Sequence, residues 1–106
     1  MIINNVEFAF SVSNLSDLEK YEKAYTKLRP AIEEGDTALK ENKLGTAAKT
    51  YIKAIKAFFL ASTGVDVVGD CEDFVLCIAF MEDFISQIAQ QKQKIHDSYF
   101  SRKKGH

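Results

Sequence analysis

The sequence predicts a mainly α protein: a three-helix antiparallel bundle, or four helices if Pro30 breaks the first, with a short N-terminal β-strand or hairpin. Two patterns predict it. Apolar residues recur at steps of three and four over most of the chain, which is the spacing of one face of a helix. Only the first residues alternate with the period of two that is typical of a strand. Because 106 residues supply one hydrophobic core but not two, we expect a single domain over residues 1–106.

Residues 1–12 are predicted to form the strand or hairpin. Within them, four apolar residues alternate with smaller or polar ones: Val6, Phe8, Phe10 and Val12. Asn4 and Asn5 lie between two apolar residues, and asparagine tolerates the positive φ of a tight hairpin turn. An isolated hairpin is marginally stable in water, so this segment must pack against the helices or pair with another chain.

The first helix is predicted over residues 14–41. Ser13 or Asn14 is a suitable N-cap, and Ser16 followed by Glu19 fits a capping box one turn later. The apolar seam of this helix consists of Leu18, Tyr21, Tyr25, Leu28, Ile32 and, after Gly35, Leu39. Its alternating steps of three and four resemble those of a coiled coil.

Pro30 lies inside this seam. Proline lacks the backbone N–H donor, and its ring clashes with the preceding turn of a helix. We therefore expect the first helix to be kinked or broken near this residue.

The second helix is predicted over residues 46–62, with Thr46 as its N-cap and Gly64 as its stop. Its apolar face consists of Ala48, Tyr51, Ile52, Ile55, Phe58, Phe59 and Ser62. The spacing of these residues indicates an amphipathic helix that packs one side into the core.

A basic face lies opposite, formed by Lys49, Lys53 and Lys56. A nucleic-acid patch is one interpretation, but three lysines are few and the net charge of the chain is −1. Ordinary solvated surface explains any single lysine. The third interpretation pairs this face with residues 66–83, which carry six acids and no base, within the fold or between subunits.

The third helix, predicted over residues 70–98, is the longest helical pattern and the one around which the chain is organised. Asp70 is the expected N-cap, and residues 99–106 are expected to form a flexible tail. The inward face consists of Phe74, Cys77, Ile78, Met81, Phe84, Ile85 and Ile88.

A second apolar stripe adds Val75, Leu76, Ala79 and Phe80, so the first half of this helix is apolar nearly all round. A lone domain of this size would leave that stripe in water, and such a patch requires a covering surface. We expect it to be the interface of a homo-oligomer, most simply a dimer. The alternative is that the N-terminal strand covers it within one chain.

The residue types of metal and redox sites are few. His96 and His106 are the only histidines, and neither has a Cys, His or carboxylate partner at the spacing of a metal site. Cys71 and Cys77 are six residues apart in the predicted third helix, a rise of about 9 Å that is too long for a disulfide. We expect buried free thiols, as in a reducing cytoplasm.

The acidic pairs Glu72–Asp73 and Glu82–Asp83 have no base beside them and are typical of solvated helix faces. The chain contains no G-x-G-x-x-G, P-loop or G-x-S-x-G pattern. We therefore expect no catalytic, cofactor-binding or metal-binding residues and no enzymatic activity.

No apolar stretch approaches the about 20 residues of a membrane span, and no leader-like run opens the chain. The nearly neutral charge gives no overall attraction to nucleic acid or membranes. The expectation is a soluble, intracellular protein whose partners are other proteins.

Three segments together resemble a known family. They are IINNVEF at residues 2–8, LEKYEKAY at residues 18–25, and CIAFMEDF at residues 77–84 with its glutamine- and lysine-rich continuation to Lys94. They are similar to small proteins encoded in the tail gene cluster of phages and prophages of Gram-positive bacteria. Those proteins are treated as tail-assembly-chaperone-like or minor tail-module proteins.

The resemblance implies a non-catalytic function in phage tail assembly through protein–protein interaction, with a tail protein as partner. It places the protein in the cytoplasm of the infected bacterium or in the virion. Two other functions need the same kind of chain: a small phage inhibitor that binds a host enzyme or defence protein, and a structural homo-oligomer. The sequence does not separate the three, because each requires only a shaped surface.

Overall fold

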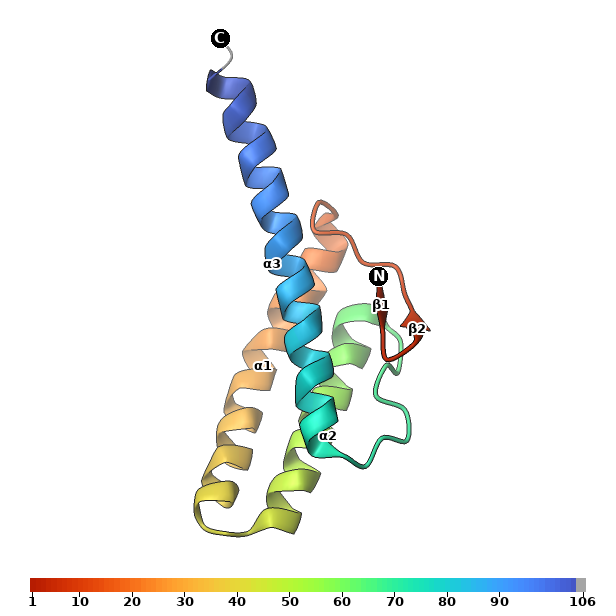
Figure 1. Ribbon diagram of the computed structural model, residues 1–106, viewed down its shortest axis with the longest axis vertical. Coiled ribbons are helices and arrows are strands. Elements are labelled where there is room, and N and C mark those ends of the chain that lie inside the picture. The colour runs from red at the N-terminus through yellow and green to blue at the C-terminus, as the bar shows by residue number, and fades with distance from the viewer. Residues whose placement is uncertain (105–106) are drawn as a thin grey trace.

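The computed structural model describes residues 1–104, with side chains as far as Arg102. Its elements in chain order are β1 (Ile2–Ile3), β2 (Val6–Glu7), α1 (Leu15–Lys40), α2 (Leu44–Thr63) and α3 (Phe74–Lys104). The predicted three-helix bundle with an N-terminal hairpin is thereby confirmed. Helices α1 and α2 form an antiparallel pair, and the loop after α2 runs back along the molecule. Consequently α3 runs in the same direction as α2 and opposite to α1 (Figure 1).

The N-terminal hairpin pairs Ile3 with Val6 across the turn. Asn4 and Asn5 have φ values of 53° and 59°, the left-handed pair that a tight hairpin turn requires. The β-strand ends at Glu7 instead of continuing to residue 12. Beyond it the chain still buries its apolar side, because Phe8 enters the core.

Helix α1 continues through Pro30, so of the expected kink or break near this residue the break does not occur. Pro30 is exposed, so its ring lies at the surface of the helix. The opposite side of the helix is buried on both sides of the proline, at Ala24, Leu28, Gly35 and Ala38. Packing against α2 along this whole length stabilises a helix that local preference would interrupt.

Gly35 allows α1 and α2 to approach closely. A Cβ atom on Gly35 would lie 2.7 Å from Cε1 of Tyr51, so only glycine leaves room for the ring. The Tyr51 hydroxyl donates a hydrogen bond to the carboxylate of Asp36, and its ring stacks on Phe74 of α3 at 5.6 Å. Tyr51 therefore connects all three helices near one end of the bundle.

The turn between α1 and α2 is shorter than predicted. Asn42 adopts a φ of 61° and ends α1, and α2 begins at Leu44. Lys43 occupies the N-cap position without a side-chain cap, so the prediction of Thr46 as N-cap is wrong. The left-handed Asn42 lets residues 41–43 reverse the chain, and Gly45 and Thr46 fall inside the helix.

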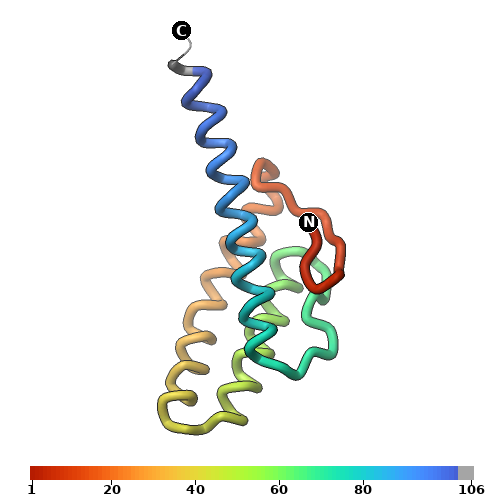
Figure 2. Tube along the Cα trace, viewed as in Figure 1, coloured from red at the N-terminus to blue at the C-terminus, as the bar shows by residue number. Residues whose placement is uncertain are grey.

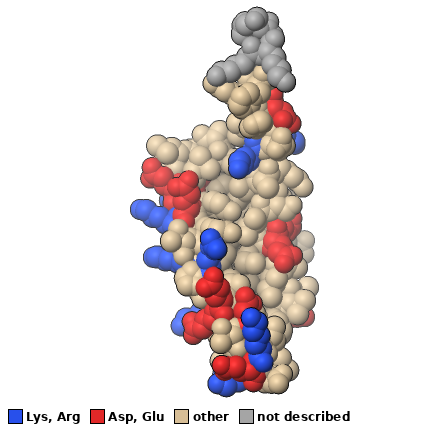
Figure 3. Space-filling view, turned by 90° about the vertical axis from the view of Figure 1, so that its left-hand side faces the viewer, with Lys and Arg blue, Asp and Glu red and all other residues tan. Residues whose placement is uncertain are grey.

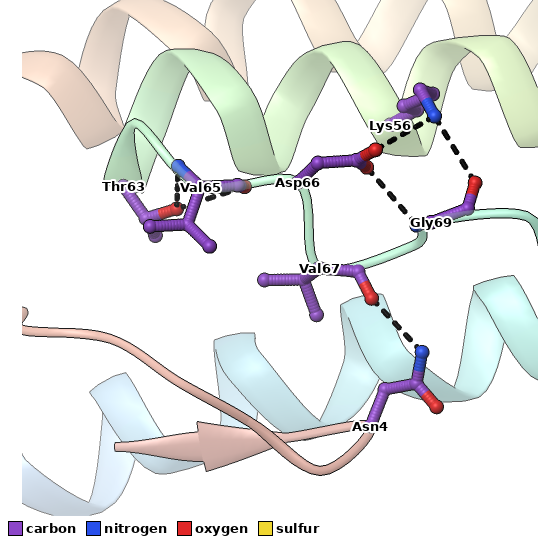
Figure 4. Close-up of polar contacts among 7 residues, drawn as sticks. All are labelled: Asn4, Lys56, Thr63, Val65, Asp66, Val67 and Gly69. Atoms are coloured by element: carbon purple, nitrogen blue, oxygen red, sulfur yellow. Dashed lines mark hydrogen bonds and ion pairs between the residues drawn. The ribbon is translucent and has the colours of Figure 1, made fainter.

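The loop between α2 and α3 is held by side chains (Figure 4). Nζ of Lys56 lies 2.9 Å from Oδ2 of Asp66 and donates to the carbonyl of Gly69 at 3.0 Å. The other Asp66 oxygen accepts from the Gly69 N–H. Asn4 of the hairpin turn donates to the carbonyl of Val67 at 2.9 Å. These bonds fix the loop between the hairpin and the bundle, with Val67 and its neighbour Val68 buried beneath.

Helix α3 begins at Phe74 and reaches Lys104, so the predicted bounds of 70–98 were wrong at both ends. Asp73, not Asp70, caps it by accepting from the N–H of Val75 and Leu76. Residues 70–73 remain in the loop because the chain first has to bury Val67 and Val68. The predicted tail is helical from residue 99 to residue 104; residues 105 and 106 lie outside the described part.

Phe84 of α3 is the centre of the core. Its ring is buried completely and contacts aromatic side chains from the hairpin segment, α1 and α2: Phe8, Phe10, Tyr21, Phe58 and Phe59. One side chain thus joins the N-terminal segment to the helices. It also explains how a hairpin of two-residue strands remains ordered.

Candidate interaction surfaces

The outer patch of α3 consists of Val75, Leu76 and Ala79. All three are exposed, with 61% of Val75 and 48% of Leu76 accessible to solvent. Phe80, the fourth residue of the predicted interface, is half-buried against the hydrophobic core. The structure therefore separates the stripe into one side chain that belongs to the fold and three that remain on the surface.

Carboxylates surround the outer patch. Glu72, Asp73, Glu82 and Asp83 are all exposed on the same stretch of chain, and no Lys or Arg lies between residues 70 and 91. Asp73 caps the helix, and Asp83 accepts a hydrogen bond from Gln87 at 3.1 Å. These roles are structural, and the surface they create is an apolar spot with a negative border.

The predicted basic face is divided between two roles. Lys56 is half-buried and holds the loop through Asp66 and Gly69, so it belongs to the fold. That contact lowers the pKa of Asp66, first through the hydrogen bond with Lys56 and then through the Gly69 N–H. Lys49 and Lys53 are exposed. The basic α2 and the acidic segment that follows are complementary within the fold at this one pair.

The two thiols do not lie in one helix, which corrects the prediction, because Cys71 precedes α3. Cys77 is buried and Cys71 half-buried, and both are free. Burial, and after it the neighbouring Cys71 thiol, raises the pKa of Cys77 to about 11. A thiol with so high a pKa is a poor nucleophile at neutral pH.

The sequence predicted no metal site, and the residues concerned are the histidines, cysteines and carboxylates. Among the described residues, no three His, Cys, Asp or Glu side chains are grouped as a metal site would require. His96 is exposed on α3, where its ring packs on Phe100 at 4.4 Å, and His106 lies outside the described residues. Nor does any described helix combine the length and apolar character needed to cross a membrane.

A groove between α1 and α3 was not visible in the sequence. It has a volume of about 220 Å³ and is lined mainly by apolar side chains: Tyr25, Leu28, Arg29, Ile32, Glu33, Met81 and Ile85. Within the described parts of both helices, no Cα atom of α1 comes within 8 Å of a Cα atom of α3. Figure 3, which looks onto this side of the molecule, shows a band with few charges between charged margins.

The end of α3 projects beyond the other elements (Figures 1 and 2). We call residues 92–102 the α3 arm. Ile88 is the last buried residue of the helix, and every side chain of the arm is exposed. The arm nevertheless carries large apolar side chains, with Ile95 47% and Tyr99 52% accessible. The sequence contained a signal for it, because these residues continue the three- and four-residue steps of the inward face.

The candidate sites of this chain are therefore three surfaces on α3: the outer patch, the groove beside α1 and the arm. Comparison of the chain with protein-family models, with curated proteins and with solved structures found no match.

Proposed function

We propose that this protein is a non-catalytic binding protein of phage tail assembly, either chaperone-like or a minor tail component. It uses the outer patch of α3 to hold an apolar segment of a tail protein. The observation that carries the proposal is the exposure of Val75, Leu76 and Ala79 at the start of a helix that also organises the core. The resemblance of the sequence to proteins of phage tail gene clusters supports a tail protein as the partner.

The border of the outer patch favours a particular kind of segment. Because Glu72, Glu82 and Asp83 are exposed around it, the electrostatic potential there is negative. An apolar segment flanked by lysine or arginine would be attracted, and one flanked by acids would be repelled. The patch is small, so we expect reversible binding at the weak end of protein–protein affinities, as suits an assembly factor that releases its client.

Co-expression with the tail-tube and tape-measure proteins of the same gene cluster tests this function. The tagged chain is expected to retain one of them after purification, and Leu76→Glu is expected to abolish the complex by placing a charge in the apolar contact. The matched control is Gln90→Glu, an exposed residue on the same helix three to four turns away, which should retain the complex.

Two results would contradict the proposal. One is the absence of a complex with either tail protein. The other is equal retention by wild type, Leu76→Glu and Gln90→Glu. If Leu76→Glu instead abolished binding to a purified host protein, the inhibitor function would replace tail assembly, with the outer patch still the binding surface.

A further inference from the structure

We infer that a second copy of this chain binds in the groove between α1 and α3, and that its own α3 arm is the helix that fills it. The two α3 helices then run antiparallel. The inference does not rest on the proposed function, because it uses a different side of α3.

Helix α3 carries a heptad pattern. One line of residues runs the whole length of the helix with steps that alternate strictly between three and four: Ile78, Met81, Ile85, Ile88, Lys92, Ile95, Tyr99 and Arg102. We call it the α3 seam. Such spacing is the pattern by which two helices pack along their whole length. In its first half, Met81 and Ile85 line the groove; from Lys92 to Arg102 its residues are exposed.

The α3 seam also defines how two antiparallel α3 helices would align. If two α3 helices cross antiparallel at Gln90, Ile85 of each faces Ile95 of the other, and Met81 faces Tyr99. Every seam residue then meets another seam residue, with an overlap of about 36 Å between residues 78 and 102. Ile88 faces Lys92 and Ile78 faces Arg102, and polar residues at fixed places in an otherwise apolar seam help to specify one register.

The two ends of the α3 region carry opposite charge. Residues 70–83 carry five acids and no base, whereas residues 92–104 carry five Lys and Arg and one acid, Asp97. In the antiparallel register, Lys94 and Arg102 of one helix lie within about one turn of the level of Glu82 and Asp83 of the other, while Asp97 is level with Asp83. A parallel pair would place like charges together, which is unfavourable. The charge distribution therefore selects both a second copy as the occupant and the antiparallel direction.

The groove between α1 and α3 has a shape that suits a helix. Tyr25, Leu28 and Ile32 of α1 face Met81 and Ile85 across a gap that side chains of this chain leave partly open. A helix in that gap would complete a four-helix arrangement from α1, α2, α3 and the arm of the second copy. Because the contact is the same on both copies, the pair is closed by a two-fold axis and does not continue into a fibre.

Light scattering and sedimentation of the full chain test the dimer. Wild type is expected to be a dimer at high micromolar concentration, with an affinity that falls as salt is added. Ile95→Glu, at an exposed position outside the core, is expected to raise the dissociation constant more than about 100-fold by burying a carboxylate. The control is Ser101→Glu on the opposite side of the arm, which should remain a dimer.

A monomeric wild type would overturn the inference, as would equal dimerisation of Ile95→Glu and Ser101→Glu. Cooperative thermal unfolding of each variant shows whether its bundle is folded.

Distances between spin labels test the direction without disturbing the seam. Labels are placed at Ala89→Cys, beside the two-fold axis, or at Ser101→Cys, in a Cys71→Ser background where the buried Cys77 does not react. The antiparallel pair predicts a short distance at position 89 and an axial separation of about 33 Å at position 101. The absence of that axial separation at position 101, or of any interchain distance at either position, would contradict the inference.

Discussion

At the scale of single residues, the fold depends on a few positions where no other side chain fits. Gly35 is the clearest, because it lies against the ring of Tyr51. Gly35→Ala is expected to destabilise the protein by about 1–2 kcal/mol net, since steric strain exceeds the gain in helix propensity. Tyr51 has no room to move, being held by Asp36 and stacked on Phe74.

Gly45→Ala is the matched control for this prediction. A Cβ atom there has no neighbour within 4 Å, and the residue lies in the first turn of α2. It should stabilise by about 0.5–1 kcal/mol, as alanine does in a helix. Urea unfolding of both variants measures the difference, and equal effects would show that the contact with Tyr51 does not limit the packing.

Phe84 is the second such position. Phe84→Ala should lower the free energy of unfolding by about 3–5 kcal/mol, because a completely buried ring is replaced by a cavity. Val75→Ala on the same helix should change it by less than about 0.5 kcal/mol, because Val75 is exposed. Similar losses for the two variants would contradict the assignment of inner and outer faces of α3.

Two buried groups determine how the stability of the protein is expected to change at alkaline pH. The pKa of Cys77 is raised to about 11 by burial and by the Cys71 thiol. The pKa of Tyr51 is raised to about 12 by its hydrogen bond to Asp36, by burial and by the Asp36 charge. Each group is an acid that prefers its neutral form in the folded state. The contribution of each group to the free energy of unfolding is therefore complete below its pKa in the unfolded state. It is lost as the pH rises toward its pKa in the folded state.

The free energy of unfolding should accordingly be lower at about pH 10.5 than at about pH 8. Cys77→Ala should remove the share of this loss that is due to the thiol, and Tyr51→Phe the share due to the phenol. An unfolding free energy that is the same at both pH values in wild type would refute the assignment.

At the scale of elements, the existence of each helix could be predicted because apolar periodicity reports one buried face. Their ends could not, since these depend on contacts distant in sequence. Asp70 is as good a cap as Asp73, and only the burial of Val67 and Val68 decides between them. A kink or break at Pro30 was predicted from local preference, and packing along α1 overrides the break.

Pro30→Ala measures that conflict directly. Alanine restores the N–H that bonds to the carbonyl of Thr26 and removes the ring from the preceding turn. Because α1 is already continuous, we expect a gain of about 1–3 kcal/mol in the free energy of unfolding. A loss of stability would show that the proline ring makes packing contacts of its own.

The candidate surfaces could be predicted in part. Val75, Leu76 and Ala79 were recognisable as apolar residues beyond the needs of the core, and they remain on the surface. Phe80 was assigned with them because a sequence pattern does not show how far the core extends round a helix. The groove depends on the separation of α1 and α3, which no local pattern reports. The apolar residues of the arm could have been predicted from the helical spacing, but Lys92 interrupts the apolar steps that lead to Ile95.

At the scale of the whole molecule, the chain is a small bundle from which one helix extends well beyond its neighbours. The molecule measures 58 × 27 × 20 Å, and its long dimension follows α3. A projecting helix of little more than ten residues is marginal in water by itself. The arm continues a helix that is already formed, and the inferred second copy would cover its exposed apolar residues.

Hydrogen exchange of the arm amides at two protein concentrations tests this most directly. If a second copy covers the arm, exchange at residues 92–102 should slow several-fold as the protein concentration rises through the dimer dissociation constant. Amides around Phe84 should change far less, because the core is formed within one chain. Rapid exchange of the arm at every concentration would contradict the account.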